Sequence, residues 1–303
     1  MRQVNTETMD NTLINVRLTE GTMDEEALVN AKIILPCDLP VKVYVGGRVV
    51  TVDDKEAMFI PPGTVIGIYS SYKRREIDFN FDIIKQEPSF SFLLPVLMTP
   101  FVIKDAAVNK ERIPEKKSPL GHILPVTGDK KAKKIIKEDE PLSPIEMIGF
   151  IYDSSEKPED TFSSLKQVIL LKTLFIMLGE DALLALSGKD THEKISSEMV
   201  NRLSLAVRFI NSEYEKQITL DDIATSAGYA RAHMSHVFKA FYGISLFDYL
   251  NSVRAHAAAK LLLTPGTTPH EAAEKSGFTS SSNFNRVFKD VCGCAPREYM
   301  KFR

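Results

Sequence analysis

The chain has 303 residues, of which 44% are hydrophobic and 26% are charged, and its formal net charge is −2. This composition is typical of a globular protein with a substantial apolar core, and the length predicts two domains. Its three cysteines make neither a disulfide framework nor a metal-binding pattern, the first residues lack the apolar stretch of a secretory signal, and the longest apolar run is too short to cross a bilayer. We therefore expect a soluble cytoplasmic protein with no membrane partner.

The segment 31–84 predicts a β-rich domain. It holds short runs of β-branched and aromatic residues, separated by turn residues such as Gly46-Gly47 and Pro61-Pro62-Gly63. Strands of this length with regular turns favour a small barrel or sandwich. The expected strands are Lys42–Val45, Val49–Val52, Ala57–Ile60, Thr64–Tyr69 and Ile77–Ile84.

Two different kinds of segment follow the expected strands. Residues 110–145 are rich in Lys, Glu and Pro, which predicts a solvated loop or a short surface helix, with an extra anion contact as the alternative. Segments Phe162–Leu178 and Asp181–Leu186 predict helices. The first carries an apolar stripe, which either packs on its own domain or forms a dimer interface.

Residues 187–190 are the expected linker, and they divide the chain into domains 1–190 and 191–303. The second domain holds 14 Lys and Arg against 11 Asp and Glu, a formal charge of +3, whereas the first has a charge of −5. A domain this mildly basic predicts modest, salt-sensitive affinity for a polyanion such as nucleic acid.

The C-terminal third contains an internal repeat. The stretch Ala224–Lys239 reads as a helix, a turn at Gly228 and a second helix with one apolar face, which is the pattern of a helix-turn-helix. Residues 234–239 recur fifty positions later as residues 284–289, whereas Gly228 matches Gly277 at forty-nine, so the second turn is one residue longer. A repeat that shares core, turn and exposed positions predicts two helix-turn-helix units.

The segment between the repeats predicts one continuous helix, Ser245–Leu263. It is rich in Ala and Leu, Ser245 is a suitable N-cap, and Pro265 and Gly266 follow its end. About 19 residues at 1.5 Å each span roughly 28 Å, close to the roughly 34 Å of one turn of B-DNA. A rigid helix of this length holds two recognition helices about one DNA turn apart.

The two units and the helix between them share a set of residues with a known family. In these residues the segment 218–299 resembles the DNA-binding domain of the AraC/XylS family of bacterial transcription regulators. The matching positions are Ile223, Ala224, Gly228, Tyr229, Phe238, Lys239, Gly243, Tyr249, Arg254, Ala258, Leu261, Leu262, Gly277, Phe278, Phe284, Arg286, Val287, Phe288, Lys289, Gly293, Pro296 and Tyr299.

The resemblance implies an α+β protein, with an N-terminal β-rich, cupin-like domain for sensing or dimerisation and a C-terminal all-α domain with a double helix-turn-helix. It implies sequence-specific promoter binding, activation of transcription, RNA polymerase as a partner and a homodimer. A small-molecule effector is the ligand that it implies for the N-terminal domain. The cupin-like match is looser than the C-terminal match.

The resemblance also places the residues that face DNA. Arginine suits guanine and asparagine suits adenine, whereas Lys239 and Lys289 are expected at phosphates or in solvent. For Arg286 the alternatives are a phosphate contact and a salt bridge within the domain. The expected contact residues are Arg231, Ala232, Ser235, His236 and Lys239 in the first recognition helix, and Ser281, Ser282, Asn283, Asn285, Arg286 and Lys289 in the second.

Two positions depart from the family pattern, and they keep other functions open. Ala230 stands where a capping Ser or Thr is usual, and His236 stands where Arg is usual. An interaction adaptor that keeps the fold without reading DNA is therefore the first alternative. A metal-dependent cupin enzyme is the second, but His122 is the only histidine before residue 192, so we expect no catalytic residues, metal or cofactor. His233 and His236 lack a third ligand.

Overall fold

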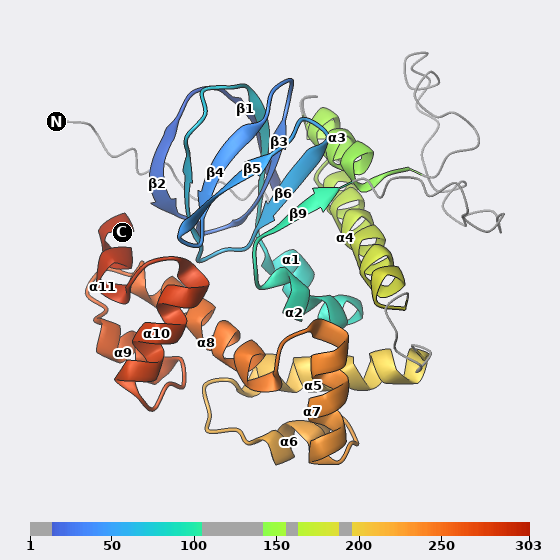
Figure 1. The fold of residues 1–303 in the computed structure, drawn as a ribbon, viewed down its shortest axis with the longest axis vertical. Helices are drawn as coiled ribbons and strands as arrows, with labels where there is room; N and C mark the ends of the chain where they lie inside the picture. The colour runs from blue at the N-terminus through green and yellow to red at the C-terminus, as the bar shows by residue number, and fades with distance from the viewer. Residues whose placement is uncertain (1–13, 105–141, 156–162, 188–195) are drawn as a thin grey trace.

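The computed structural model describes residues 14–104, 142–155, 163–187 and 196–303. An antiparallel β domain forms the N-terminal part, and a row of helices forms the C-terminal part (Figure 1). The predicted Lys- and Pro-rich segment lies almost wholly outside the described residues, as does most of the expected linker.

Two antiparallel sheets face each other in the β domain. The first has the strand order β1-β8-β3-β6-β9, and the second has the order β2-β7-β4-β5. The strands are β1 (Ile14–Thr19), β2 (Met23–Ala27), β3 (Ala31–Pro36), β4 (Val41–Val45), β5 (Arg48–Val52), β6 (Glu56–Ile60), β7 (Val65–Ile68), β8 (Arg74–Phe79) and β9 (Phe101–Lys104).

Alternation along the strands divides their side chains between two cores. Ile34 and Met58 point between the sheets and pack with the valines of β4, whereas Ile33 and Phe59 belong to a second core that the helices share. Strands β4 to β7 match the predicted segments within a residue or two, and Gly46 has the positive φ of +57° that the β4–β5 turn requires.

The strand prediction Ile77–Ile84 is wrong in its second half. Strand β8 ends at Phe79, because the Asn80 side chain accepts a hydrogen bond from the Asp82 backbone N–H at 2.9 Å and turns the chain. The short helix α1 (Asp82–Lys85) follows. Its apolar residues happen to extend the alternation of apolar and polar residues that strand β8 shows.

Helical segments cover the outer face of the first sheet. They are η1 (Pro88–Leu93), α2 (Leu94–Leu97), α3 (Pro144–Ser155) and α4 (Ser163–Ser187). Phe175 of α4 packs edge-on against Phe59 with ring centroids 5.8 Å apart, and Leu171 is fully buried beside it. The stripe therefore packs on its own domain at Leu171 and Phe175, whereas Leu165 at its start is 56% exposed.

The two helices predicted for residues 162–186 form one helix, α4. Gly179 lies inside it, where a Cβ atom would stand only 2.9 Å from Leu93 Cδ2. The glycine thus permits close packing against η1 and does not end the helix.

The β domain also contains a buried ion cluster. Lys32 donates to Glu76 at 2.8 Å, and Arg74 donates to the other oxygen of the same carboxylate at 2.8 Å. All three side chains are at most 3% exposed, and Asp78 lies 3.1 Å from the Lys32 ammonium. These cations hold the pKa of Glu76 at about 2, although burial acts in the opposite direction.

The C-terminal part is all-α, as the sequence predicts. Its elements are α5 (Ser197–Glu213), α6 (Leu220–Ser226), α7 (Arg231–Tyr242), α8 (Leu246–Leu262), α9 (Pro269–Lys275), α10 (Ser281–Cys292), α11 (Pro296–Tyr299) and η4 (Met300–Phe302). Helix α8 runs between the α5–α7 group and the α9–α11 group (Figure 1). No helix in the described ranges is long and apolar enough to span a membrane.

Candidate nucleic-acid interface

Helices α6 and α7 form the first helix-turn-helix unit. Ala224 is 1% exposed, and its carbonyl accepts a hydrogen bond from the Tyr229 N–H at 2.9 Å, which closes the turn. Gly228 takes a φ of +67° there, the conformation that glycine adopts without steric cost. Met234 and Phe238 are fully buried on the inner face of α7.

Helices α9 and α10 repeat this unit with a turn that is one residue longer. Residues 227–230 connect the first pair and residues 276–280 the second, which confirms the predicted extra residue. Gly277 has a φ of +85°, and a Cβ atom there would clash with the carbonyl oxygen of Tyr214 and stand 2.9 Å from Arg254 Nε. The second turn therefore needs glycine for space as well as for φ.

Arg254 of α8 fixes the segment that follows α5, against which the second turn packs at Gly277. Its guanidinium donates to the carbonyl oxygens of Tyr214 and Lys216, both at 2.8 Å. Burial lowers the pKa of this arginine, and backbone carbonyls alone serve as its acceptors among the described contacts. This residue, matched to the family by its position, is a structural one.

Helix α8 is capped as the sequence predicts. The Ser245 side chain accepts a hydrogen bond from the Asp248 N–H, and the Asp248 carboxylate accepts one from the Ser245 N–H, forming a capping box. The helix has 17 residues and so spans about 25 Å. Gly266, with a φ of +88°, follows its end.

The predicted contact residues of α7 lie on its outer side. Arg231, Ala232, His236 and Lys239 are exposed, and Ser235 is half-buried. The Arg231 guanidinium stands 3.4 Å from the Asp221 carboxylate of α6, in an exposed ion pair that solvent weakens.

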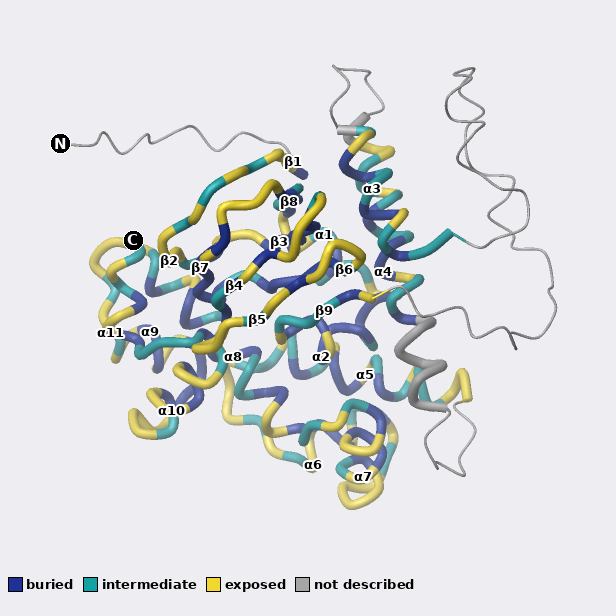
Figure 2. The backbone as a smooth tube through the Cα atoms, turned by 45° about the horizontal axis from the view of Figure 1, so that its top comes forward, coloured by how far each residue is buried: buried dark blue, intermediate teal, exposed yellow. Residues whose placement is uncertain are grey.

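The predicted contact residues of α10 form the corresponding surface of the second unit. Ser281, Ser282, Asn285, Arg286 and Lys289 are exposed, and Asn283 is half-buried. The Arg286 guanidinium donates to Asn283 Oδ1 at 3.0 Å and to Asp290 at 3.4 Å. Figure 2 shows the exposed sides of α7 and α10 on the periphery of the protein.

The two recognition helices begin differently. Ser280 accepts a hydrogen bond from the Asn283 N–H at the start of α10, whereas Ala230 gives α7 no side-chain cap. A missing cap of this kind typically costs about 1 kcal/mol. Helix α7 is therefore less stabilised at its N-terminus than α10 is.

His233 has a packing partner within the first unit. Its ring lies edge-on to Tyr229 with centroids 4.7 Å apart, and the Arg202 guanidinium stacks on the same tyrosine at 4.8 Å. Within the described ranges no group of three His, Cys, Asp or Glu side chains is placed to hold a metal ion.

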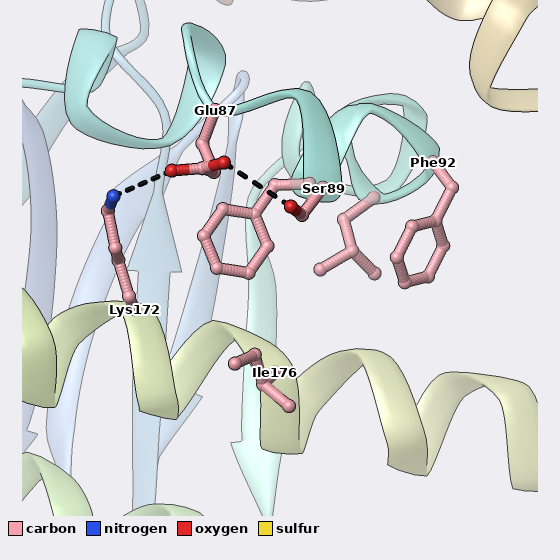
Figure 3. A pocket seen from close by; sticks show the side chains of 7 residues that line it. Glu87, Ser89, Phe92, Lys172 and Ile176 are labelled. Atoms are coloured by element: carbon pink, nitrogen blue, oxygen red, sulfur yellow. Dashed lines mark hydrogen bonds and ion pairs between the residues drawn. The ribbon is translucent and has the colours of Figure 1, made fainter.

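A pocket of about 360 Å³ lies in the β domain between η1 and α4. Lys172 donates to Glu87 at 2.8 Å on one side of it, and Ile176 points toward it from α4 (Figure 3). Phe92 and other apolar side chains of η1 line the opposite wall. The pocket is thus mainly apolar, with one ion pair beside it.

The described part of the β domain packs on the helical part through a shared apolar core, and three of the contacts between them involve α7, α8 and α10, which the sequence did not predict. The Tyr242 hydroxyl at the end of α7 donates to the Phe92 carbonyl at 2.7 Å, and burial raises the pKa of that tyrosine. His256 of α8 contacts two backbone carbonyls of the β domain. Gly293, which ends α10, packs against the β4–β5 turn at Gly46.

No sequence signal indicated these contacts. His256 sits among alanines, whose small side chains let α8 approach the β domain closely, but the same pattern also suits an internal helix of the C-terminal part. The three contacts fall on the first unit, the connecting helix and the second unit, so the β domain fixes all three parts of the double unit.

Comparison with known families matches residues 223–301 to a helix-turn-helix domain. A lactose operon transcription activator from Staphylococcus xylosus is 32% identical over 106 residues, which cover 35% of this chain and 38% of that protein. A probable transcription factor, PqrA of Proteus vulgaris, is 33% identical over 82 residues, covering 27% of this chain and 67% of that protein.

The match spans less than half the length of the first curated relatives. Among solved structures, ToxT from Vibrio cholerae superposes with a TM-score of 0.48 at 12% identity, covering 95% of this chain and 97% of that one.

Proposed function

This chain belongs to the AraC/XylS family of transcription regulators, and we propose that it binds promoter DNA sequence-specifically and activates transcription. The observation that carries the proposal is the pair of helix-turn-helix units joined by one helix, α8. Because α8 spans about 25 Å and a DNA turn about 34 Å, the two recognition helices reach adjacent major-groove segments on one face. Residues 191–303 carry this function.

Within the second unit, Arg286 is the principal base reader. It extends from an exposed surface, and its partners Asn283 and Asp290 lie on its own helix, where they orient the guanidinium across the groove edge. Its fork matches the two acceptors of guanine, and Asn285 has the donor and acceptor that adenine requires. Lys239 and Lys289 lie in the last turns of their helices and bind phosphates.

Residues 1–190 sense a signal and form a homodimer, and the dimer works in the cytoplasm with RNA polymerase as its partner. The exposed apolar residues Leu165, Ile169 and Ile176 recur on α4 at intervals of four and seven, which is one face of a helix. This face supports a helix-to-helix dimer contact. The pocket beside Lys172 supports a small, mainly apolar effector.

The experiment that tests the proposal is selection of bound fragments from a genomic DNA pool by the purified full chain, followed by affinity measurement on the selected site. The Arg286→Ala variant should bind the selected site about 1–3 kcal/mol more weakly, because one bidentate base contact is lost. Arg297→Ala is the matched control, since Arg297 is an exposed arginine on α11, outside both recognition helices.

An interaction adaptor that keeps the fold without reading DNA is the alternative function, and the uncapped α7 favours it. In that case the full chain would enrich no fragment over competitor DNA, and Arg286→Ala and wild type would bind every DNA equally. Enrichment of a site that Arg286→Ala binds more weakly, with Arg297→Ala unchanged, supports the regulator.

A further inference from the structure

Each recognition helix contacts the β domain at its C-terminal end. Helix α7 ends at Tyr242, whose hydroxyl donates to the Phe92 carbonyl of η1 at 2.7 Å. Helix α10 is followed by Gly293, where a Cβ atom would stand 3.1 Å from Gly46 Cα and 3.3 Å from the Gly47 backbone nitrogen in the β4–β5 turn. Two separate segments of the β domain therefore hold the two helices.

Buried side chains strengthen both contacts. Leu93 of η1 and Phe238 of α7 belong to one apolar cluster, and both are at most 5% exposed. Val65 of β7, which is 1% exposed, belongs to the apolar cluster of the second unit together with Phe288 of α10. Because a close-packed core resists deformation, cores shared in this way hold both recognition helices firmly on the β domain.

The internal repeat separates this contact from the ordinary need for glycine at a helix end. Gly243 and Gly293 occupy the same place in the two units, and both end their helix in the left-handed conformation, with φ of +74° and +94°. Among the described residues, a Cβ atom at Gly243 would meet nothing within 4 Å, whereas one at Gly293 would press on the β4–β5 turn. Gly293 therefore has a second reason to be glycine, which is the close approach of the β domain.

We propose that the β domain is a positioning element for both recognition helices, which sets, together with α8, the spacing between the two DNA segments that the chain accepts. Helix α8 sets the separation of the two units, but a recognition helix held from one side alone can still tilt. The contacts at Tyr242 and Gly293 hold α7 and α10 at their ends as well, which restricts this tilt. The inference rests on the proposed function for the DNA segments, whereas the placement of the helices is testable without DNA.

The effect on spacing follows from the geometry of B-DNA. Adding one base pair between the two segments moves the second segment by about 3.4 Å and turns it by about 35° around the duplex axis. A recognition helix that is held in place cannot follow this turn, so it loses base contacts. Wild type should therefore bind the altered site at least about fivefold more weakly, since one good base contact provides at least that factor.

The first test measures the distance between α7 and α10 by pulsed electron paramagnetic resonance in the full chain without DNA. Spin labels at Ala240 and Asp290, equivalent exposed positions, are attached through a keto-bearing amino acid, so that the cysteines stay unlabelled. Gly293→Asn keeps a residue that tolerates a positive φ and adds a side chain against the β4–β5 turn, so the distance should shift or its distribution broaden. Gly243→Asn is the matched control and should give the wild-type distribution. A wild-type distribution in Gly293→Asn overturns the proposal.

A second pair of variants tests the contact of α7 in the same measurement. Tyr242→Phe removes the hydroxyl that bonds to Phe92 and should broaden the distance distribution. Tyr249→Phe is the matched control, because its hydroxyl accepts a hydrogen bond from Asn211 at 2.6 Å within the helical part, and its loss should leave the distribution unchanged. Equal distributions in these two variants overturn the positioning of α7 by the β domain.

The second test measures affinity for the selected DNA site and for the same site with one base pair added or removed between its two segments. Wild type and Gly243→Asn should prefer the original spacing, whereas the preference of Gly293→Asn should fall towards equal binding. A mere loss of folded protein would weaken binding to every site alike and leave the ratio between spacings unchanged. The wild-type ratio in Gly293→Asn overturns the proposal. If no site is selected at all, the proposed function fails and the spacing falls with it, while the label distances still decide how the helices are positioned.

Discussion

Replacing Gly277 by alanine separates the two reasons for a glycine in the second turn. Alanine at its φ of +85° costs roughly 1–2 kcal/mol for the left-handed backbone alone. The new methyl group also meets the carbonyl oxygen of Tyr214 and stands 2.9 Å from both the Glu215 carbonyl oxygen and Arg254 Nε. Relieving such a clash costs about 1–3 kcal/mol, so the expected total is roughly 2–5 kcal/mol.

Gly228→Ala is the matched control, because Gly228 holds the same position in the first unit with a φ of +67°. Its added methyl group meets only the end of the flexible Arg202 side chain, at 3.1 Å. We expect a loss of about 1–2 kcal/mol, from the backbone alone. Urea unfolding followed by circular dichroism measures both variants, and equal losses would show that the Arg254 clamp does not confine the second turn.

Three further variants test other parts of the structure. Glu76→Gln removes the carboxylate that pairs with the buried Arg74 guanidinium, while the Lys32 ammonium keeps Asp78 at 3.1 Å. The variant should destabilise the chain by about 3–5 kcal/mol at pH 7 in urea unfolding, with the exposed Glu26→Gln unchanged. Because the pKa of Glu76 is about 2, the stability that Glu76 supplies to wild type is present above pH 4.5 and is lost as the pH falls towards 2. His236→Arg should bind the selected DNA more tightly than wild type at low salt, because arginine carries a permanent charge and a fork that fits phosphate or guanine, and equal affinities would exclude position 236 as a contact. Ile169→Glu should convert a dimer to monomer in light scattering, and an unchanged mass would remove α4 from the interface.

The C-terminal part was predictable from sequence because the chain repeats itself there. Gly228 and Gly277 each have a positive φ, and Ser245 caps the connecting helix, as the residue types indicate. Such signals are local, since a cap or a turn involves residues within four positions of one another. The repeat supplies a second, independent copy of each signal. A residue that matched the pattern by chance in one unit would lack its counterpart in the other.

The β domain was harder to predict for two reasons, a weak local signal and contacts with distant partners. Strand β8 stops at Phe79, where the Asn80 side chain accepts a hydrogen bond from the Asp82 N–H, and the apolar alternation that continues beyond Phe79 masks this local signal. Helix α4 passes through Gly179 because Leu93, far away in sequence, packs against that glycine. His256 joins segments more than 150 residues apart, and no spacing within α8 indicates such a contact.

Which residues contact DNA depends on how α7 and α10 enter the DNA major groove, and the fold of the chain alone does not determine this. All the residues expected at DNA lie on exposed or half-buried positions of α7 and α10, which a reading surface requires. Their roles at individual bases stay predictions, and the exposure of Arg286 beside Asn283 makes it the position where substitution is most informative.

The most direct test of the central claim is a hydroxyl-radical footprint of the full chain on its selected DNA site. Two recognition helices held by one helix of about 25 Å should protect two adjacent major-groove segments, about one helical turn apart and on one face of the duplex. With Arg286→Ala, protection should weaken first in the segment that α10 reads. Protection confined to a single groove segment, or none over competitor DNA, would contradict the account.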